Sequence, residues 1–455
     1  MGQKYELHVL LLPYPSQGHI NPMLQFAKRL SFHNIQTSMA ITRFISNSTR
    51  PEPGPVSIVH ISDGFDENGF SSAPSIEGYL TRFESIGSET LTDLIELFRS
   101  KENPVQILVY DAFLPWALDV ANRAGIRTAA FFTQSCGVDA IYWQVWEGRL
   151  KYPVNEPVQL GPGLVRFEPW DLPSFLSDPI PGPYPTYLKL VLNQFENLKK
   201  ADVLLINSFY ELEPEEFEWM KSSWRVKSIG PTLPSAYLDD RVPSDSNYAF
   251  NLHNPDSTPY LQWLNSKPHS SVIYVSFGSM ASLSSDQTNE LTSTLVNTKY
   301  SFLWVVRASE AATLPKNFIQ ETQAKGLVVT WCNQLEVLTH DAVGCFLTHC
   351  GWNSTTESIA LGVPMVCTPQ WTDQTTNAKY IEDVWGIGVR ARVEDGSGVV
   401  KREELERRIG EVMEGERREE IRRNAGKWKE LAKEAVSEGG SSDKNIVEFI
   451  EEFCK

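Results

Sequence analysis

Residues Trp331 to Gln374 combine an aromatic ring, a polar turn and a closing polar pair within 44 positions. The stretch begins with a lone Trp, carries His349-Cys-Gly-Trp-Asn-Ser354 at its centre and closes on Asp373-Gln374. Trp331 offers a flat surface to a planar base, and base–aromatic stacking is worth roughly 1–3 kcal/mol. His349 and Ser354 can donate hydrogen bonds to phosphate, and Glu357 can accept them from ribose hydroxyls. Together these groups could bind a nucleotide sugar.

The elements around this stretch could position these groups. Residues 326–330 and 344–348 are short apolar runs with the length and β-branching typical of strands. After the second run, a Gly-containing turn leads to Asn353 and Ser354, which we expect to cap a helix that Gly362 and Pro364 end. Such a strand, turn and helix start would direct backbone N–H groups at one point, which suits a diphosphate without a metal.

The whole 44-residue stretch resembles the signature box of the plant family 1 glycosyltransferases, which use UDP-sugars to decorate small molecules. The resemblance extends from the first strand to the last helices. It implies a set of donor contacts: Trp331 on uracil, Gln334 and Glu357 on ribose, His349, Asn353 and Ser354 on the diphosphate, and Trp352, Asp373 and Gln374 on the sugar. A terminal Gln in this box is similar to glucose users, whereas galactose users tend to carry His. Ser279, in the turn after another strand, is a further candidate phosphate donor, and by resemblance Thr133 reaches the glucose from the N-terminal side.

Two residues could activate an acceptor. His19 follows the first strand, residues 8–13, in a loop that we expect to precede a helix over residues 23–30, and Asp111 ends the strand QILVYD. A neutral imidazole is a suitable general base for a hydroxyl. A carboxylate on its other nitrogen would set the tautomer and stabilise the imidazolium, as in hydrolase triads. The family pattern has the same His and Asp, which implies inverting, metal-independent transfer from UDP-glucose as co-substrate, with no cofactor.

The acceptor is less defined. The candidate apolar walls of the acceptor pocket are Tyr14, Phe113 and Trp371. Phe113 lies two residues past Asp111, and Trp371 neighbours Asp373 and Gln374, here called the sugar pair. A phenolic, a steroid or an aromatic acid would fit such walls. The flank PQWTDQTTNAKYIEDVW is similar to the subgroup that acts on salicylate, auxin and thiohydroximates, so that hydroxyl, carboxyl and thiol acceptors all stay open.

Alternating apolar strands and helices occur twice along the chain, which favours an α/β fold with parallel sheets. The resemblance implies the GT-B arrangement of two facing, Rossmann-like, doubly wound parallel-sheet domains. We expect an N-terminal acceptor-binding domain over residues 1–240, a linker over 241–258 and a C-terminal UDP-sugar-binding domain over 259–435. In residues 436–455, apolar positions at i, i+3, i+4 and i+7 predict an amphipathic helix, which by resemblance packs back on the N-terminal domain.

Composition excludes several partners. The net charge of −16 argues against nucleic acid and anionic membranes, so local dipoles must capture the diphosphate. No apolar run is long enough for an integral membrane segment, and the six sparse cysteines are typical of reduced thiols in a cytoplasmic protein. We expect a monomer.

The sequence offers three alternatives to this function. His340, Cys345, His349 and Cys350 could suggest zinc, but they lack the paired spacing of structural sites. An NAD-dependent oxidoreductase is disfavoured because the Gly-rich residues 386–391 precede a strand instead of linking a strand to a helix. A non-catalytic UDP-sugar or small-molecule binding protein remains the alternative, against which the presence of both His19 and Asp111 argues.

Overall fold

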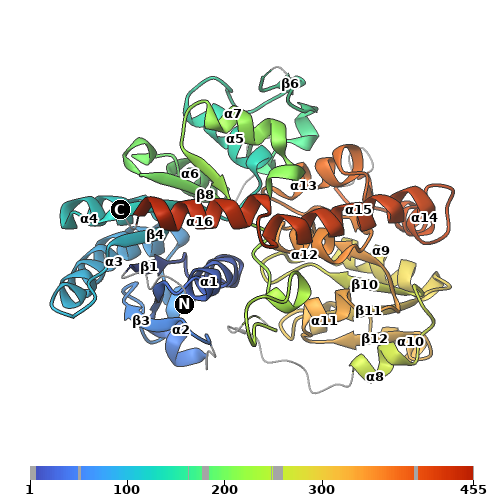
Figure 1. The fold of residues 1–455 in the computed structure, drawn as a ribbon. Helices are drawn as coiled ribbons and strands as arrows, with labels where there is room; N and C mark the ends of the chain where they lie inside the picture. The colour runs from blue at the N-terminus through green and yellow to red at the C-terminus, as the bar shows by residue number, and fades with distance from the viewer. Residues whose placement is uncertain are drawn as a thin grey trace. The chain divides into compact units, whose positions relative to one another are not determined.

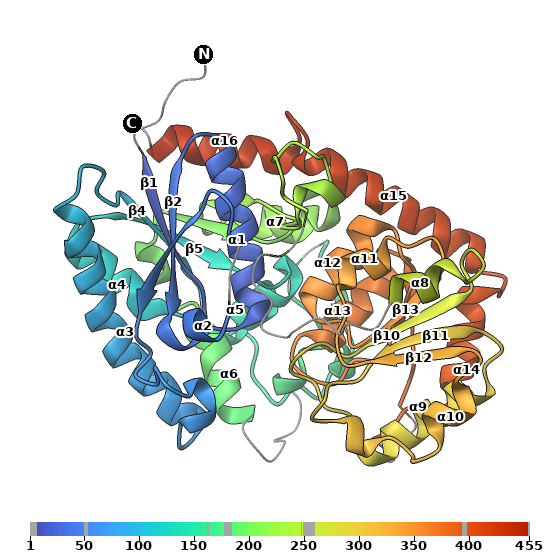
Figure 2. The same cartoon turned by 90° about the horizontal axis from the view of Figure 1, so that it is seen from below.

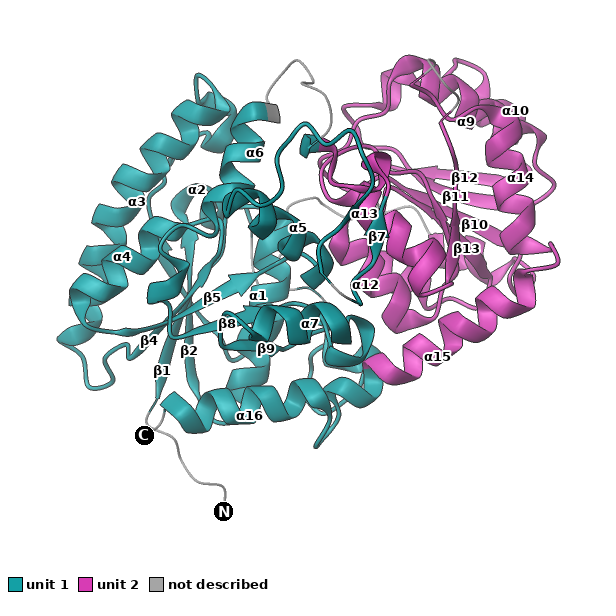
Figure 3. Ribbon diagram, turned by 90° about the horizontal axis from the view of Figure 1, so that it is seen from above, with its two compact units in different colours: residues 1–167, 175–252, 433–455 teal, residues 168–174, 253–432 magenta. Residues whose placement is uncertain are grey.

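The computed structural model describes residues 7–49, 53–161, 163–176, 184–246, 248, 260–393 and 398–453 (Figure 1). The chain divides into two compact units (Figure 3). Unit 1 comprises residues 1–167, 175–252 and 433–455, and unit 2 comprises residues 168–174 and 253–432. Residues 168–174, which lie within the expected N-terminal domain, therefore belong to unit 2. Most of the expected linker lies outside the described residues.

Unit 1 is built on a parallel sheet with the strand order β3-β2-β1-β4-β5-β8-β9 in the described part of the chain. Its strands are β1 (His8–Leu12), β2 (Gln36–Thr42), β3 (Ser57–Ile61), β4 (Ile107–Asp111), β5 (Arg127–Phe132), β8 (Val203–Ile206) and β9 (Val226–Ser228), beside a small antiparallel pair of β6 (Val158–Gln159) and β7 (Arg166–Phe167). Every residue of β1 and β4 is buried, as expected for parallel strands covered on both faces.

The helices of unit 1 are α1 (Gln17–Phe32), α2 (Arg43–Ser48), α3 (Ile76–Arg99), α4 (Pro115–Ala124), α5 (Cys136–Trp146), α6 (Tyr184–Asn193), α7 (Pro214–Lys221) and α16 (Ser441–Phe453). Helices α1 and α16 cover one face of the sheet, and α3 and α4 cover the other (Figure 2). The apolar face of α16, with Ile446, Phe449, Ile450 and Phe453, lies in the same core as Val9 and Leu11 of β1 and the apolar side of α1.

Unit 2 repeats this pattern, with the parallel order β12-β11-β10-β13-β14-β15 among its described residues. Its strands are β10 (Val272–Ser276), β11 (Ser301–Val305), β12 (Gly326–Val329), β13 (Val343–Thr348), β14 (Met365–Cys367) and β15 (Gly388–Arg390). Its helices are α8 (Tyr260–Asn265), α9 (Ser285–Asn297), α10 (Phe318–Thr322), α11 (Gln334–Leu338), α12 (Trp352–Leu361), α13 (Gln374–Lys379) with a π-helical turn (Tyr380–Val384), α14 (Arg402–Met413) and α15 (Arg418–Val436), within which the division into units falls.

Both sheets have the doubly wound order, in which the chain reverses direction across the sheet after its first three strands. The reversal lies between β1 and β4 in unit 1 and between β10 and β13 in unit 2. Ligands of such folds bind beyond the carboxyl ends of the strands at this point. The predicted fold class, two Rossmann-like parallel-sheet domains, is confirmed, and the topology indicates where each unit places its functional residues.

Among the described helices, none is both long and apolar enough to cross a membrane. Cysteines 136, 332, 345, 350 and 367 are buried and form no disulfide, and Cys454 lies outside the described residues.

Candidate active site

His19 and Asp111 form a hydrogen-bonded pair at the reversal point of unit 1. Imidazole Nδ1 and Asp111 Oδ2 are 2.7 Å apart, and the Asp111 side chain is 1% exposed. The second carboxylate oxygen accepts a hydrogen bond of 3.0 Å from the backbone N–H of Phe113. A carboxylate can only accept, so Nδ1 carries the ring proton and Nε2 presents a lone pair. The pair can therefore remove a proton through Nε2.

The structure corrects the expected helix start next to His19. Helix α1 begins at Gln17, with Ser16 as N-cap, and continues through Pro22, so that His19 lies in its first turn and not in a loop. The expected helix began only after Pro22 because proline normally limits a helix. Here the early helix places the imidazole directly beyond β1, beside the end of its neighbour β4.

Aromatic rings and a hydroxyl surround the imidazole. The ring centroid of His19 lies 5.3 Å from that of Tyr14 and 4.9 Å from that of Phe113. Burial raises the pKa of Tyr14, which keeps its hydroxyl neutral. Thr133 Oγ1 lies 3.3 Å from His19 Nδ1. The structure thus brings four predicted residues of unit 1 around His19. The remaining predicted wall, Trp371, belongs to unit 2, where it packs against that unit's core.

In unit 2, the central turn joins β13 to α12. Cys350 has a left-handed backbone, with φ of 67°, and Gly351 is the N-cap of α12. The prediction that Asn353 and Ser354 cap this helix was wrong, because the preceding turn starts the helix earlier than side-chain preference suggests. Both residues instead lie in its first turn. The C-terminal end at Gly362, in a left-handed conformation, is confirmed.

His349 is buried in the same turn, against two glycines. A Cβ atom added at Gly278 or Gly351 would lie 2.7 or 2.6 Å from its Nε2, so neither position tolerates a side chain without displacing the ring. Burial, assisted by the nearby Arg307 charge, lowers the pKa of His349 to about 4, against the smaller opposing effect of the Ser276 backbone. The imidazole is therefore neutral near pH 7 and can offer a hydrogen bond but no positive charge.

The neighbouring loop after β10 carries Ser279. This residue is exposed, directly after Gly278, whose φ of 72° turns the chain. The Arg307 guanidinium donates to the backbone oxygens of Ser279 and Ala281 and forms a 2.7 Å ion pair with Glu310. Arg307 thus holds the loop in place.

The predicted ribose residues are connected to one another. Gln334 Nε2 donates to Ser354 Oγ over 2.9 Å and to Glu357 Oε2 over 2.7 Å, and its Oε1 accepts from the Tyr274 hydroxyl. Trp331 lies half-buried three residues before Gln334, between β12 and α11. The network fixes the Gln334 amide and the Glu357 carboxylate relative to the start of α12.

The predicted sugar pair lies at the start of α13. Gln374 Oε1 accepts hydrogen bonds of 2.9 and 3.1 Å from the backbone N–H groups of Gln370 and Trp371. Asn377 Nδ2 donates both to Asp373 Oδ2, at 2.8 Å, and to the Cys350 carbonyl, at 2.9 Å. Asn377 therefore ties the sugar pair to the turn before α12.

The remaining predicted sugar residue, Trp352, is the first residue of α12. Its ring is buried and lies 6.1 Å from that of Trp385, between ring centroids.

Some residues that hold this site together were not predicted from the sequence. Asn377 could have been found, since it lies one helical turn after Asp373 in the quoted flank. Arg307 and the left-handed Thr372, with φ of 57°, carry no local signal, because their roles depend on long-range contacts.

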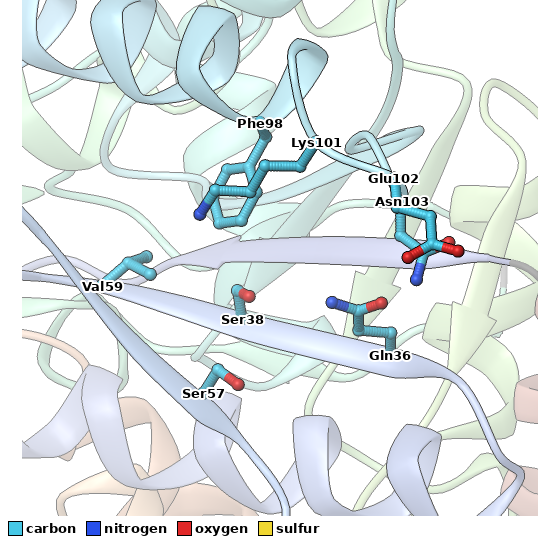
Figure 4. Close-up of a pocket in the computed structure, with 8 residues that line it drawn as sticks. All are labelled: Gln36, Ser38, Ser57, Val59, Phe98, Lys101, Glu102 and Asn103. Atoms are coloured by element: carbon cyan, nitrogen blue, oxygen red, sulfur yellow. The ribbon is translucent and has the colours of Figure 1, made fainter.

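Neither a cavity in unit 1 nor the candidate zinc ligands include the predicted catalytic pair. A cavity of about 310 Å³ lies at the amino ends of β2 and β3, whereas His19 and Asp111 lie beyond the carboxyl ends of the strands (Figure 4). It is lined by Gln36, Ser38, Ser57, Val59, Phe98, Lys101, Glu102 and Asn103. Within the described ranges, no three His, Cys, Asp or Glu side chains are grouped to hold a metal ion. His340, one of the zinc candidates, instead contacts Asn265 Oδ1 at 3.0 Å.

Comparison with known proteins identifies the family of this chain. The family described as UDP-glucoronosyl and UDP-glucosyl transferase matches residues 240–425. Crocetin glucosyltransferase 2 of Crocus sativus is 57% identical over 447 residues, which cover 98% of this chain and 97% of the relative. UDP-glycosyltransferase 74F2 of Arabidopsis thaliana is 50% identical, over 97% of both chains.

Solved structures show the same fold. Os79 from O. sativa, in complex with UDP, superposes with a TM-score of 0.93 at 44% identity, covering 98% of this chain and all of the other. A UDP-glucosyltransferase from Polygonum tinctorium superposes with a TM-score of 0.82 at 28% identity, over 99% of both chains. With full-length identity this high to several glucosyltransferases, the chain belongs to the plant family 1 UDP-glycosyltransferases and is a UDP-glucosyltransferase that acts on small molecules.

Proposed function

We propose that this enzyme transfers glucose from UDP-glucose to a hydroxyl or carboxyl group of a small lipophilic plant metabolite, with inversion and without a metal ion. His19 is the general base, and Asp111 orients it. The observation that carries this proposal is the 2.7 Å hydrogen bond between His19 Nδ1 and the buried Asp111 carboxylate, which leaves the Nε2 lone pair for the acceptor.

With a hydroxyl acceptor, the oxygen attacks the anomeric carbon of UDP-glucose as its proton passes to His19 Nε2. An ionised carboxylate attacks the same carbon with no proton to transfer. The bond from that carbon to the phosphate oxygen breaks, and its electron pair leaves with UDP. Attack from the face opposite UDP produces the β-glucoside. Asp111 stabilises the imidazolium that forms.

The donor is assigned to unit 2. Trp331 stacks on the uracil, and Gln334 and Glu357 bind the ribose hydroxyls. The start of α12 binds the diphosphate, since the first N–H groups of a helix and its dipole favour anions.

Side chains around this helix start complete the donor site. His349 adds a neutral hydrogen bond, in keeping with its lowered pKa. Asn353 and Ser354 add polar groups from the first turn of α12, and Ser279 adds one from the loop after β10. Asp373 and Gln374 bind the glucose. Trp352 contributes through its backbone, since its ring is buried against Trp385.

The acceptor pocket is assigned to the aromatic groups around the base. Tyr14 and Phe113 flank the imidazole and present flat apolar surfaces, and we assign Trp371 to the same function. Thr133 contacts His19 and is proposed to contact the glucose. Relatives are named for crocetin and flavonols, and Os79 is seen with a trichothecene, which supports a lipophilic acceptor. We further propose that its acceptors fall within the range of the subgroup that acts on salicylate, auxin and thiohydroximates. We also propose that the enzyme is a cytoplasmic monomer.

The test is UDP release from UDP-glucose in EDTA, against phenolic, steroidal and carboxylic acceptors, with product masses recorded. The proposal predicts acceptor-dependent release and a mass gain of one hexose. A requirement for added Mg²⁺ or Mn²⁺ would contradict the metal-independent mechanism. UDP-glucose binding without turnover on any acceptor would favour a binding protein instead.

A further inference from the structure

A segment from the N-terminal half of the sequence is built into unit 2 next to the sugar pair. Residues 168–174, here called the strap, belong to unit 2 by their contacts. The strap contains a short 3-10 turn (Pro169–Asp171), and its residues Asp171 and Leu172 are buried. Its contacts lie on α13, on the loop that precedes it and on Arg390 at the end of β15.

One end of the strap is held by charge. Asp171 Oδ1 accepts a hydrogen bond of 2.8 Å from Arg390, and its Oδ2 lies 3.5 Å from Lys379 Nζ. Asp171 and Arg390 are both buried, and Arg390 also donates to the carbonyl of Trp170 at 2.9 Å. A buried ion pair with additional hydrogen bonds sets a defined geometry, because breaking it leaves an unpaired buried charge.

The first turn of α13 is fastened to the same segment. Thr375 Oγ1 donates to the Leu172 carbonyl at 2.6 Å, and Thr376 Oγ1 donates to the Asp171 carbonyl at 2.8 Å. Both threonines directly follow Gln374, one of the two proposed glucose contacts. The strap therefore sets the position of the helix start that carries this residue.

At its other end, the strap clamps the backbone of the loop itself. Ser174 N–H donates to the Thr372 carbonyl at 2.9 Å, and Ser174 Oγ accepts from Thr372 N–H at 2.7 Å. Thr372 has φ of 57°, which is unfavourable for a β-branched residue. Such a conformation persists only where surrounding contacts enforce it. Ser174 therefore binds both the N–H and the carbonyl of Thr372, the residue immediately before Asp373.

From these contacts we infer that the strap positions Asp373 and Gln374 for the glucose of the donor, with Ser174 as its main positioning residue. This inference rests on the proposed function, in which these two residues bind the sugar. It predicts that damage to the strap weakens recognition of glucose and leaves recognition of UDP unchanged, because the uracil, ribose and diphosphate contacts lie on other elements of unit 2.

The test compares Ser174→Ala with wild type by calorimetric binding of UDP-glucose and of UDP. Ser174→Ala leaves the Thr372 N–H without its acceptor, and we expect Kd for UDP-glucose and KM for UDP-glucose to rise about five- to tenfold. Kd for UDP should stay within about twofold of wild type, since the proposed contacts to uracil, ribose and diphosphate are kept. Ser174→Thr retains a hydroxyl acceptor and should recover most of the affinity.

Two further variants keep the test decisive. Ser266→Ala removes an exposed hydroxyl of unit 2 whose hydrogen bond, among the described residues, goes to the Trp263 carbonyl of its own helix end. It should change neither affinity. If Ser174→Ala fails to fold, Thr375→Val removes one strap bond with little change in shape and should give the same selective loss.

Equal losses of UDP and UDP-glucose affinity, or no loss of either, would overturn the inference. Binding is measured without an acceptor, so these outcomes do not depend on turnover. An inactive wild-type enzyme would instead count against the proposed function.

Discussion

Replacing Asp111 with Asn tests the proposed base most directly, because the structure shows that an amide cannot satisfy both partners of the carboxylate. One oxygen accepts from Phe113 N–H at 3.0 Å, and the other accepts from His19 Nδ1 at 2.7 Å. An Asn side chain has one oxygen and one NH₂ group. If the NH₂ faces Phe113, two donors oppose each other. If it faces His19, Nδ1 must become an acceptor, and the proton moves to Nε2, where it blocks the base.

The magnitude follows from these contacts. Loss of a hydrogen bond to a charged group costs about 1.5–3 kcal/mol, or roughly 10- to 150-fold in rate. The wrong imidazole tautomer has a cost of about 10⁴-fold in the corresponding hydrolase triad. For Asp111→Asn we therefore expect kcat/KM on a phenolic acceptor to fall by at least about 100-fold.

The assay is the initial rate of UDP release with a phenol, alongside calorimetric Kd for UDP and circular dichroism as controls of the donor site and the fold. UDP affinity should be unchanged, because Asp111 lies in unit 1 and the proposed UDP contacts lie in unit 2. A variant that folds and retains a rate within about threefold of wild type would refute the assignment of Asp111 as the residue that orients the base.

Three other predictions can be measured independently. His19→Ala should abolish transfer to hydroxyl acceptors and leave UDP binding nearly intact, yet retain more activity on carboxylic acids, which are already ionised; wild-type turnover on a phenol would remove His19 from its role. Gly278→Ala should raise Kd for UDP by about tenfold, because the added Cβ would lie 2.7 Å from a ring nitrogen of His349. Gly398→Ala is the matched control, since Gly398 has a φ of 65°, similar to that of Gly278, with open space around the added Cβ. This control should bind UDP normally. Burial raises the pKa of Glu213 from 4.5 to about 7, so the folded state retains a proton that the unfolded state loses. The contribution of Glu213 to the free energy of unfolding should therefore decline as pH rises from 4.5 to 7, by roughly 3 kcal/mol at most. Thermal unfolding of Glu213→Gln should show a flatter pH dependence over this window, and an unchanged slope would contradict the shift.

The fold was predictable because its strands are continuous apolar runs between amphipathic helices. Strand β1 and strand β13 were expected within one or two residues of where they lie. Helix starts were less accurate. Helix α1 begins before its proline and α12 begins before its polar cap candidates. In both cases the turn after a strand determines where the helix begins, and its backbone geometry is not written in side-chain preference.

Most of the proposed donor residues could be named together from the sequence because they are close along the chain, around one strand and one helix. Their side-chain geometry was not. The bonds from Gln334 to Ser354 and Glu357 cross between two helices, and the neutral state of His349 follows from its burial. Burial and partner geometry depend on how distant segments pack, so that only the folded chain defines them.

By itself, the sequence determined the fold class and the family signature, and it named His19 and Asp111 as the proposed catalytic pair, since these inferences depend on local patterns and on a few chemically distinctive residues. The tertiary structure alone decided which of these residues contact one another. It joined His19 to Asp111 across 92 positions of sequence, and it brought Ser174 against Thr372 across 198. Such contacts connect segments with no shared local pattern, because they arise from the packing of whole elements, and this is why the sequence contained no sign of the strap beneath the sugar pair.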